Sequence, residues 1–364
     1  MKFKKGLEKI KAYQPGKPIE EVKRTLGLKE VYKLASNEIP FEPSYIKKAV
    51  SDEIKNINRY PESGCFYLRS LLARKLKIKD SQMVFGNGSD EIITLILRAM
   101  VGSNNDEVII AYPTFLMYAI QAKVEGAKVI EVPLKNLRYD LASIAKKVNK
   151  RTKIIFIANP DNPTGTYVNQ KEVESFLKSI PKDLLVYFDE AYFEFAPPDF
   201  PRTMDFLKKR GNIIIGRTFS KIFGLAGLRL GYCITTEEIA GMLNKIRDPF
   251  NINRFAQVSA QAALRDKNFL KKVLSYVKKE KEYLYNELNK LNISYTKSAT
   301  NFILIDFKKG VSSLCGYLLK NGVIVRDLTS WGLKNFFRVS IGLHEENKKF
   351  ITCLKKYLIT EANI

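Results

Sequence analysis

Strand-like and helix-like segments alternate through the first two thirds of this 364-residue chain. The strand-like segments are short apolar runs such as EVIIAY, TKIIFIAN, DLLVYFDEA and NIIIGRTF. Helix-like stretches such as DEIITLILRAM and NQKEVESFLKSI lie between several of them. This alternation is the pattern of a mostly parallel sheet covered by helices. The sequence therefore predicts an α/β fold.

The last third of the chain has a different pattern. A long charged helix is expected over roughly residues 267 to 290, followed by TNFILIDF, VIVRDL and FFRVSIG with short helices around them. A single core usually stops growing at about 250 to 300 residues, so the length fits one large domain and one smaller domain. We expect an N-terminal arm over residues 1–32, a large domain over 33–255 and a small α+β domain over 256–364.

The formal net charge of +23 raises the hypothesis of a nucleic-acid-binding protein. The lysines, however, are spread over the polar faces of helix-like segments such as KKVLSYVKKEKEYLYNELNK. The sequence has no arginine-rich arm and no platform of basic and aromatic residues in alternation. We therefore expect no nucleic-acid partner, while a basic field favours small anionic substrates.

Membrane, metal and disulfide chemistry are also disfavoured. No apolar run approaches the roughly 20 residues of a membrane helix, and the N-terminal MKFKKGLEKIKAY lacks the apolar core of a secretory signal, so we expect a cytosolic protein. The chain has one histidine, His344, although metal sites and nucleophilic relays draw on histidine more than on other residues. The cysteines lie far apart, at Cys65, Cys233, Cys315 and Cys353.

The segment TFSKIFGLAGLRLGY, Thr218 to Tyr232, places Lys221 in a glycine-rich, otherwise apolar stretch between two strand-like runs. Desolvation lowers the pKa of a lysine and frees its amine as a nucleophile, which suits Schiff-base chemistry. Arg229 follows eight positions later. In isolation, a lysine near an arginine is more often a solvated surface pair, so this interpretation depends on the other motifs.

The segment DEAY, which begins with Asp189, follows the apolar run LLVYF. α/β sheets place ligand groups at the carboxyl ends of their strands, and a pyridoxal phosphate site needs an acid there to keep the ring nitrogen protonated. Tyr192 is expected to reach the phenolic oxygen of such a ring. The alternative for this motif alone is a carboxylate that caps a helix.

Three further motifs follow strand-like runs. ANPDNPTG requires a turn and offers the amide of Asn162 toward a ring. FGNGSDE sets two glycines before an apolar helix, whose first amides would point at an anion. Tyr112, in AYPTF, could lie flat against an aromatic cofactor.

Arg338, in the apolar run FFRVSIG, should meet a carboxylate of protein or substrate, because an unpaired buried guanidinium is costly.

Together these motifs resemble the fold-type I pyridoxal phosphate aminotransferases and, among them, the histidinol-phosphate aminotransferases. The resemblance covers nearly the whole chain. It includes LASNE, RYPES, GNGSDE, AYPTF, NPDNPTG, DEAYFEF, RTFSKIFGLAGLRLGY, TNFIL, VIVRD and FRVSIG.

The resemblance implies a role for each of these residues. Lys221 carries the cofactor and shuttles a proton, Asp189 pairs with the ring nitrogen, Tyr192 and Asn162 bond the O3′ oxygen, and Tyr112 stacks on the ring. The residues implied to hold the cofactor phosphate are Ser89, Asp90, Thr218, Ser220 and Arg229, with Tyr60 reaching over from a second subunit. Such a shared site implies a homodimer.

For the substrates, the resemblance implies that Arg338 binds the α-carboxylate of glutamate, while Arg326 and Tyr13 bind the phosphate of histidinol phosphate. Asn37, in LASNE, is also expected at the substrate. The chain departs from the usual family pattern at Ile39 and Glu42, in NEIPFEPS, and at Asp161, in NPDNPTG, which we expect to face away from the ring.

The sequence therefore predicts an aminotransferase that converts histidinol phosphate and 2-oxoglutarate to imidazole-acetol phosphate and glutamate, or the reverse, as a step of histidine biosynthesis. Three alternatives remain at this point. They are a threonine-phosphate decarboxylase, an aromatic or broad-range aminotransferase, and a nucleic-acid-binding protein with a decayed site. The intact set of Lys221, Asp189, Tyr192 and Arg229 disfavours the last of these.

Overall fold

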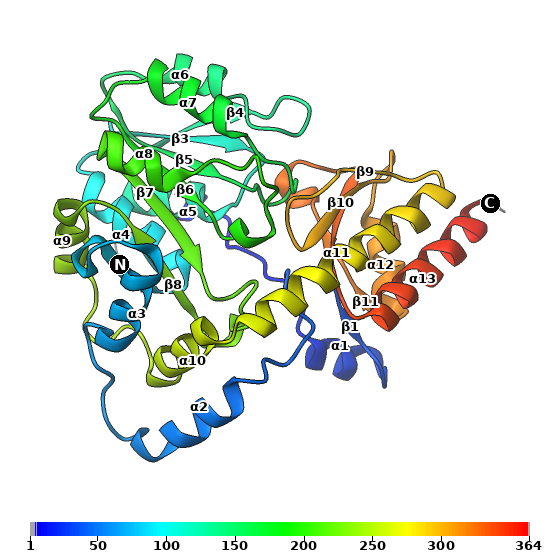
Figure 1. Cartoon of the computed structure of the whole chain (residues 1–364). Coiled ribbons are helices and arrows are strands. Elements are labelled where there is room, and N and C mark those ends of the chain that lie inside the picture. Colours follow the sequence, from blue (N-terminus) through cyan, green and yellow to red (C-terminus); the bar gives the residue numbers. More distant parts are fainter. Residues whose placement is uncertain (1–3, 5, 363–364) are drawn as a thin grey trace.

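The computed structural model describes residue 4 and residues 6–362, which form a large α/β part and a smaller α+β part (Figure 1). The α/β prediction is confirmed, since the largest sheet is mostly parallel and is covered by helices. None of the helices within the described residues is long and apolar enough to cross a membrane.

The large sheet has seven strands in the order β2-β8-β7-β6-β5-β3-β4, and only β8 runs antiparallel to its neighbours. The strands are β2 (Met83–Asn87), β3 (Glu107–Tyr112), β4 (Lys128–Pro133), β5 (Thr152–Ala158), β6 (Leu185–Asp189), β7 (Ile213–Thr218) and β8 (Leu230–Ile234). Since the sheet is covered on both faces, its central strands are continuous apolar runs rather than alternating ones.

Helices enclose this sheet, with α6, α7 and α8 on one side and α4 and α5 on the other (Figure 1). The helices of this part are α2 (Ile46–Glu53), α3 (Phe66–Leu76), α4 (Ser89–Met100), α5 (Met117–Glu125), α6 (Leu141–Lys147), α7 (Gln170–Ser179), α8 (Thr203–Arg210), α9 (Glu237–Ile246) and α10 (Arg254–Arg265). Several begin with a side-chain cap, as in α7, where Asn169 and Glu172 form a capping box.

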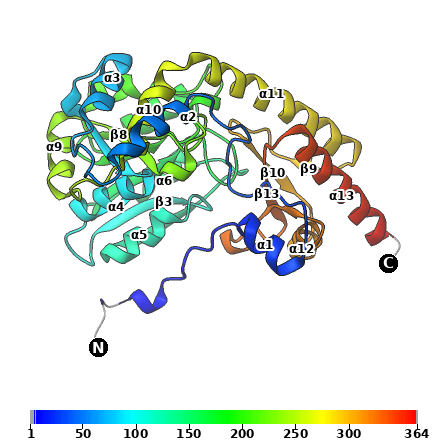
Figure 2. The same ribbon diagram turned by 90° about the horizontal axis from the view of Figure 1, so that it is seen from below.

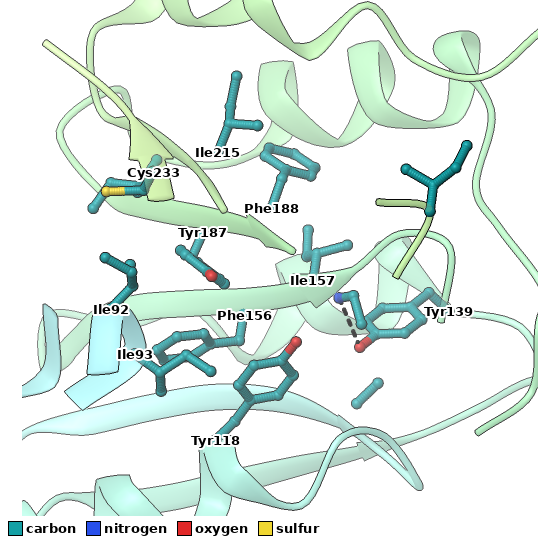
Figure 3. Close-up of a cluster of buried hydrophobic side chains, with 14 of the residues drawn as sticks. Ile92, Ile93, Tyr118, Tyr139, Phe156, Ile157, Tyr187, Phe188, Ile215 and Cys233 are labelled. Atoms are coloured by element: carbon teal, nitrogen blue, oxygen red, sulfur yellow. Dashed lines mark hydrogen bonds between the residues drawn. The ribbon is translucent and has the colours of Figure 1, made fainter. Parts of the chain in front are cut away.

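The core of the large part lies on both faces of its sheet, between the strands and the helices that cover them (Figure 3). Phe156, Ile157, Phe188 and Ile215 are fully or almost fully buried, and each such side chain contributes about 1.5–3 kcal/mol of transfer free energy. The ring of Tyr118, on α5, stacks on Phe156 with the centroids 4.9 Å apart. Its hydroxyl is the polar end of an otherwise apolar cluster, and it faces the end of β6.

The small part contains an antiparallel sheet in the order β12-β13-β10-β9 and a parallel pair, β1 with β11. Its strands are β1 (Tyr32–Lys33), β9 (Ser294–Tyr295), β10 (Phe302–Asp306), β11 (Val323–Ile324), β12 (Arg326–Asp327) and β13 (Phe336–Ser340). Its helices are α1 (Ile19–Leu26), α12 (Ser312–Lys320) and α13 (His344–Ala362).

The long helix α11 (Lys267–Lys290) runs along both parts (Figures 1 and 2). The side chain of Asp266 caps its start by accepting hydrogen bonds from two backbone amides. Phe269, Val273, Val277 and Leu284 recur at helical spacing on its buried face, while many of its lysines face solvent, as expected from the sequence.

Two connections cross the expected domain limits, which themselves stay a prediction. Residues 32–33 pair with β11 of the small part, and the amide of Ser340 donates to the carbonyl of Leu34. Helix α10, expected in the small domain, packs on α2 and α3. The N-terminal chain therefore belongs to the small part before it enters the large one.

Candidate active site

The carboxyl ends of the parallel strands meet at one edge of the large sheet, where α/β folds bind their ligands. A cavity opens at this edge. Its lining residues are Ser89, Asp90, Phe115, Tyr118, Ala158, Pro160, Asn162, Asp189, Ala191, Tyr192, Thr218, Ser220, Lys221 and Arg229. The structure thus brings together all the residues expected to hold the cofactor except Tyr112 and Tyr60.

Lys221 lies in the loop that follows β7, three residues after the end of the strand. Its amine is partly buried and donates a 3.4 Å hydrogen bond to the carbonyl of Ser36. Burial and the positive charge of Arg338 lower the pKa of the Lys221 amine to about 8. Near neutral pH the uncharged fraction of this amine is therefore much larger than that of an ordinary lysine, which favours its action as a nucleophile.

Asp189 is the last residue of β6 and is buried. Its Oδ2 accepts a 2.7 Å hydrogen bond from the hydroxyl of Tyr118, and its Oδ1 accepts one of 3.0 Å from the amide of Ala191. Burial raises the pKa of Asp189 to about 6, while the bond from Tyr118 acts in the opposite direction. The sequence motifs do not point to Tyr118, although a buried tyrosine usually finds a partner for its hydroxyl.

Tyr192 is buried close to Lys221, whose amine lies 5.6 Å from the centre of the tyrosine ring. The side-chain amide of Asn37 donates a 2.7 Å hydrogen bond to the Tyr192 hydroxyl. Asn37 is itself held by Ser340 of the small part, which accepts from its backbone amide at 2.7 Å and donates to its Oδ1 at 3.0 Å. Asn37, expected at the substrate, thus also joins the two parts of the molecule at Tyr192.

The start of α4 provides an anion site. Ser89 and Asp90 form the first turn of this helix, whose free amides favour a negative charge. Gly88 precedes them with φ 79°, and a Cβ at this position would collide with the guanidinium of Arg229. Arg229 pairs with Asp90 at 3.2 Å, and both side chains are well exposed to solvent. In the same cavity, Thr218 Oγ1 accepts a 3.0 Å hydrogen bond from the amide of Ser220.

The expectation that Tyr112 stacks on a cofactor ring is not supported by its position. Tyr112 ends β3 and faces a second cavity, which is also lined by Tyr13 and Arg326. The chain then passes through Pro113 and Thr114 and brings Phe115 into the first cavity. Strand periodicity places Tyr112 correctly at the end of β3 but carries no information about the turn that follows, which selects Phe115.

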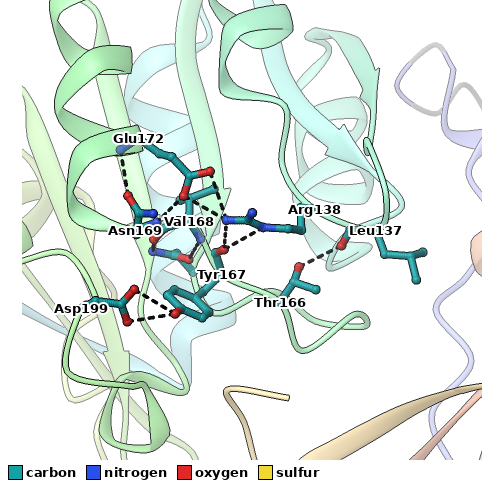
Figure 4. Close-up of polar contacts among 9 residues, drawn as sticks. Leu137, Arg138, Thr166, Tyr167, Val168, Asn169, Glu172 and Asp199 are labelled. Carbon is teal, nitrogen blue, oxygen red and sulfur yellow. Dashed lines mark hydrogen bonds and ion pairs between the residues drawn. The ribbon is translucent and has the colours of Figure 1, made fainter. Parts of the chain in front are cut away.

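Asp161 does not line the cavity. It is buried and accepts 2.8 Å hydrogen bonds from the hydroxyls of Thr114 and Thr164. The rest of this loop is fastened by polar contacts with the segment before α6, including Thr166 to the carbonyl of Leu137 and Arg138 to Glu172 (Figure 4). This network fixes the loop from which Asn162 projects into the cavity.

Arg338 is buried on β13 and donates to Asn162 Oδ1 and, at 2.8 Å, to the carbonyl of Ala35. Burial lowers the pKa of its guanidinium to about 10, and the charge of Arg326 adds to this effect. Within the described part of the chain no carboxylate forms an ion pair with Arg338, and its Nε has no hydrogen-bond partner. The sequence predicts a carboxylate of the protein or of the substrate as its partner, and the described residues of the protein do not supply one.

Arg326, on β12, is buried beside Arg338. Its Nη2 donates to the carbonyl of Gln14, and its guanidinium carbon lies 5.5 Å from the ring centre of Tyr13 and 4.6 Å from that of Trp331. The structure thus brings Arg326 and Tyr13 together, as expected, and adds Trp331, which lies outside the sequence motifs.

Tyr60 lies away from this cavity. It is 79% exposed and stacks on Phe250 with the ring centres 4.7 Å apart. Ile57, Phe66 and Tyr67 are also exposed apolar residues of the same stretch of chain. Tyr60 does not line the cavity of its own chain, so the role expected for Tyr60 requires a second chain.

The fold and the site together define a class. A seven-stranded, mostly parallel sheet places a lysine, a strand-end acid and an anion site around one cavity, and residues 29–354 match the family model of class I and II aminotransferases. The chain therefore belongs to the class I and II aminotransferases.

Individual relatives narrow this assignment. The chain is 43% identical over 364 residues to a histidinol-phosphate aminotransferase of Brevibacillus brevis, with all of both chains covered. It is 42% identical to one from Moorella thermoacetica, over 98% of this chain and 93% of the relative. The solved histidinol-phosphate aminotransferase of Sinorhizobium meliloti, in complex with pyridoxal-5′-phosphate, superposes with a TM-score of 0.91 at 26% identity, over 98% of each chain. Within its class, the protein belongs to the histidinol-phosphate aminotransferases.

Proposed function

We propose that this protein uses pyridoxal phosphate to transfer an amino group between histidinol phosphate and 2-oxoglutarate. The observation that carries the proposal is the pair Arg326 and Arg338, two buried guanidinium groups that form no ion pair with a carboxylate of the described residues. Arg338 donates to Asn162, which lines the cavity of Lys221. Such a pair suits the phosphate of one substrate and the carboxylate of the other. The names of the relatives support the same substrate.

The cavity fits the cofactor in its donor set. Lys221 offers an amine, Asp189 a carboxylate, and the first turn of α4 with Arg229 an anion site. Asn162 and Tyr192 are in position to bind a phenolic oxygen, and Phe115 offers an aromatic face. When bound, pyridoxal phosphate supplies an electron-withdrawing ring that stabilises negative charge on the substrate carbon that loses its proton.

The protein residues have separate tasks in this reaction. Lys221, with its lowered pKa, would accept the proton from the substrate Cα and deliver it to the C4′ carbon of the bound cofactor. Asp189 keeps a proton on the ring nitrogen, and the Tyr118 hydroxyl favours the ionised form of this carboxyl. Asn37 orients Tyr192 through its amide.

The two substrates use the two arginines differently. Arg338 binds the carboxylate of glutamate or 2-oxoglutarate, and Arg326 with Tyr13 binds the phosphate of histidinol phosphate. Because β12 and β13 are paired, the two guanidinium groups lie next to each other, and one pocket serves both substrates in turn.

A homodimer completes the proposal. Tyr60 is exposed and does not line the cavity of its own chain, so it can reach the cofactor phosphate of a second subunit, and Ile57, Phe66 and Tyr67 of the same stretch offer exposed apolar area. The cytosolic location expected from the sequence stays a prediction.

The test is a substrate screen of the purified, cofactor-loaded enzyme. Histidinol phosphate with 2-oxoglutarate should give glutamate at a rate well above that with phenylalanine or aspartate. Release of CO₂ from threonine phosphate would identify a decarboxylase instead. Equal rates with phosphorylated and unphosphorylated donors would identify a broad-range aminotransferase.

A further inference from the structure

Trp331 is the only tryptophan of the chain, and it is 1% exposed. It ends a short 3-10 helix, Thr329–Trp331, just after β12. One face of its indole lies against Arg326, at 4.6 Å from the guanidinium carbon. Its ring nitrogen donates a 3.0 Å hydrogen bond to the backbone carbonyl of Thr114, which belongs to the large part of the molecule.

Arg326 depends on aromatic rather than acidic neighbours. The adjacent Asp327 is turned away, because its carboxylate accepts hydrogen bonds from Ser312 at 3.0 Å and from the amide of Thr329 at 2.7 Å. An aromatic face attracts a guanidinium without neutralising its charge. Arg326 is therefore held in place while its charge stays available to an anion.

Thr114, the other partner of Trp331, is fixed in the large part. Its hydroxyl donates to Asp161 at 2.8 Å and lies 2.7 Å from the hydroxyl of Tyr139. The Tyr139 hydroxyl in turn accepts a 3.1 Å hydrogen bond from the amide of Ala158, at the end of β5 (Figure 3). The next residue in the chain, Phe115, lines the cofactor cavity.

We infer that Trp331 is a positioning residue which sets the place of Arg326 relative to the cofactor cavity and so favours phosphorylated substrates over unphosphorylated ones. This inference rests on the proposed function, because it assigns the substrate phosphate to Arg326. Trp331 contacts Arg326 with its face and the backbone beside Phe115 with its edge. Trp331 therefore links the phosphate site directly to the backbone beside the cavity through one rigid side chain.

Two variants separate the effect of the aromatic face of Trp331 from that of its hydrogen bond. Trp331→Phe keeps an aromatic face but loses the hydrogen bond to Thr114, and Trp331→Leu loses both. Trp331→Leu should lower kcat/KM for histidinol phosphate roughly 10- to 100-fold, since a displacement of about 1 Å can reduce a rate by that amount. Trp331→Phe should fall between Trp331→Leu and the wild type, and the half-reaction with glutamate should change far less in both.

The matched control is Phe350→Leu. Phe350 is a fully buried aromatic residue of the small part, packs on Phe337 and has no contact with Arg326. This variant should lose stability without changing the ratio of the two half-reactions. If Trp331→Leu and Phe350→Leu reduce both half-reactions alike, Trp331 has a structural role only and the inference is overturned.

Binding of inorganic phosphate to the cofactor-loaded enzyme, measured by calorimetry, provides a second test that needs no turnover. Arg326→Ala should weaken this binding. If Trp331 acts through Arg326, adding Trp331→Leu to Arg326→Ala should have little further effect, whereas additive losses would refute the inference.

The two tests distinguish the inference from the proposed function. A wild-type enzyme that does not use histidinol phosphate but shows the non-additive phosphate binding would refute the proposed substrate and keep the role of Trp331. Phosphate binding that does not depend on Arg326 would refute the role of Trp331 whatever the substrate is.

Discussion

Arg326 and Arg338 lie directly opposite each other as register partners on β12 and β13. Like charges in this arrangement destabilise a sheet, and the charge of Arg326 is one reason for the lowered pKa of Arg338. Neither arginine is neutralised by a carboxylate among residues 4 and 6–362; their hydrogen-bond partners are Gln14, Ala35 and Asn162. The free enzyme therefore carries an electrostatic cost that a bound anion relieves.

The two arginines should respond oppositely to removal. Arg326→Ala should cost histidinol phosphate about 2–4 kcal/mol of transition-state binding and glutamate much less, because a charge-assisted contact to the phosphate is lost. Arg338→Ala should instead impair glutamate most. The two half-reactions, followed separately by cofactor absorbance, measure this difference, and equal losses for both substrates in both variants would contradict it.

Lys221→Ala should abolish turnover and the covalent attachment of the cofactor. Borohydride reduction followed by peptide mapping should find the label on Lys221 in the wild type. Lys281 is a suitable control, because burial also lowers the pKa of its amine to about 8 while it donates to the carbonyl of Ser298, outside the cavity. Lys281→Ala should keep label and activity, and a label on any other lysine would refute the assignment.

Tyr118→Phe should shift the acid limb of the pH–rate profile to higher pH. Its hydroxyl stabilises the ionised form of Asp189, so its loss raises the pKa of that carboxyl further above the ordinary value. Since the reaction needs ionised Asp189, activity falls as the pH drops through this pKa, and the variant loses activity earlier on acidification. An unchanged profile would show that Tyr118 only fills space.

Asp189→Asn should raise the activation barrier of transamination by several kcal/mol and so lower its rate. Cofactor occupancy should stay nearly unchanged. A neutral amide cannot hold the proton on the ring nitrogen, whereas the phosphate site at the start of α4 remains intact. Single-turnover rates and cofactor content, measured on the same preparation, distinguish a loss of rate from a loss of cofactor. Wild-type rates in the variant would exclude the proposed role.

Phe115→Ala should weaken cofactor binding several-fold, in line with the roughly 0.5–1.5 kcal/mol of an aromatic stacking contact. Tyr112→Ala should leave it nearly unchanged, because Tyr112 faces the second cavity. Equilibrium dialysis of the cofactor compares the two variants directly. The reverse order would restore the role that the sequence suggested for Tyr112.

Mixed dimers test the shared site. Tyr60→Phe and Lys221→Ala chains should each be impaired alone, but hybrids should regain part of the activity, because one of the two sites then combines a normal lysine with a normal tyrosine. Hybrids that form and remain inactive would argue for a self-contained site.

Much of the fold could be predicted because its signals are local. The apolar runs that end at Ala158, Asp189 and Thr218 predicted buried parallel strands, and the polar residues after them converge at one edge of the sheet. The positions of Lys221 and Asn162 follow from the same logic.

What the sequence could not reveal depends on turns and on distant contacts. Phe115 rather than Tyr112 lines the cofactor cavity because of the short connection between β3 and α5, which has no periodicity that a sequence pattern could reveal. The hydrogen bond from Tyr118 to Asp189 joins residues that are 71 positions apart, and the one from Trp331 to Thr114 joins residues 217 positions apart. Neither contact leaves a pattern in its own segment.

The pairing of β1 with β11 affects how the chain folds while it is being synthesised. Tyr32 pairs with Val323, so the first strand of the small part leaves the ribosome long before its partner has been made. Domains generally fold as units during synthesis, N-terminal first. Here the apolar cluster of Val22, Val31 and Ala35 is complete only after Ile324 has been synthesised. The large part of the chain is synthesised between these two events. A C-terminal fragment expressed alone would therefore lack one strand and the helix α1, and cutting the chain at a single linker cannot release the small part intact.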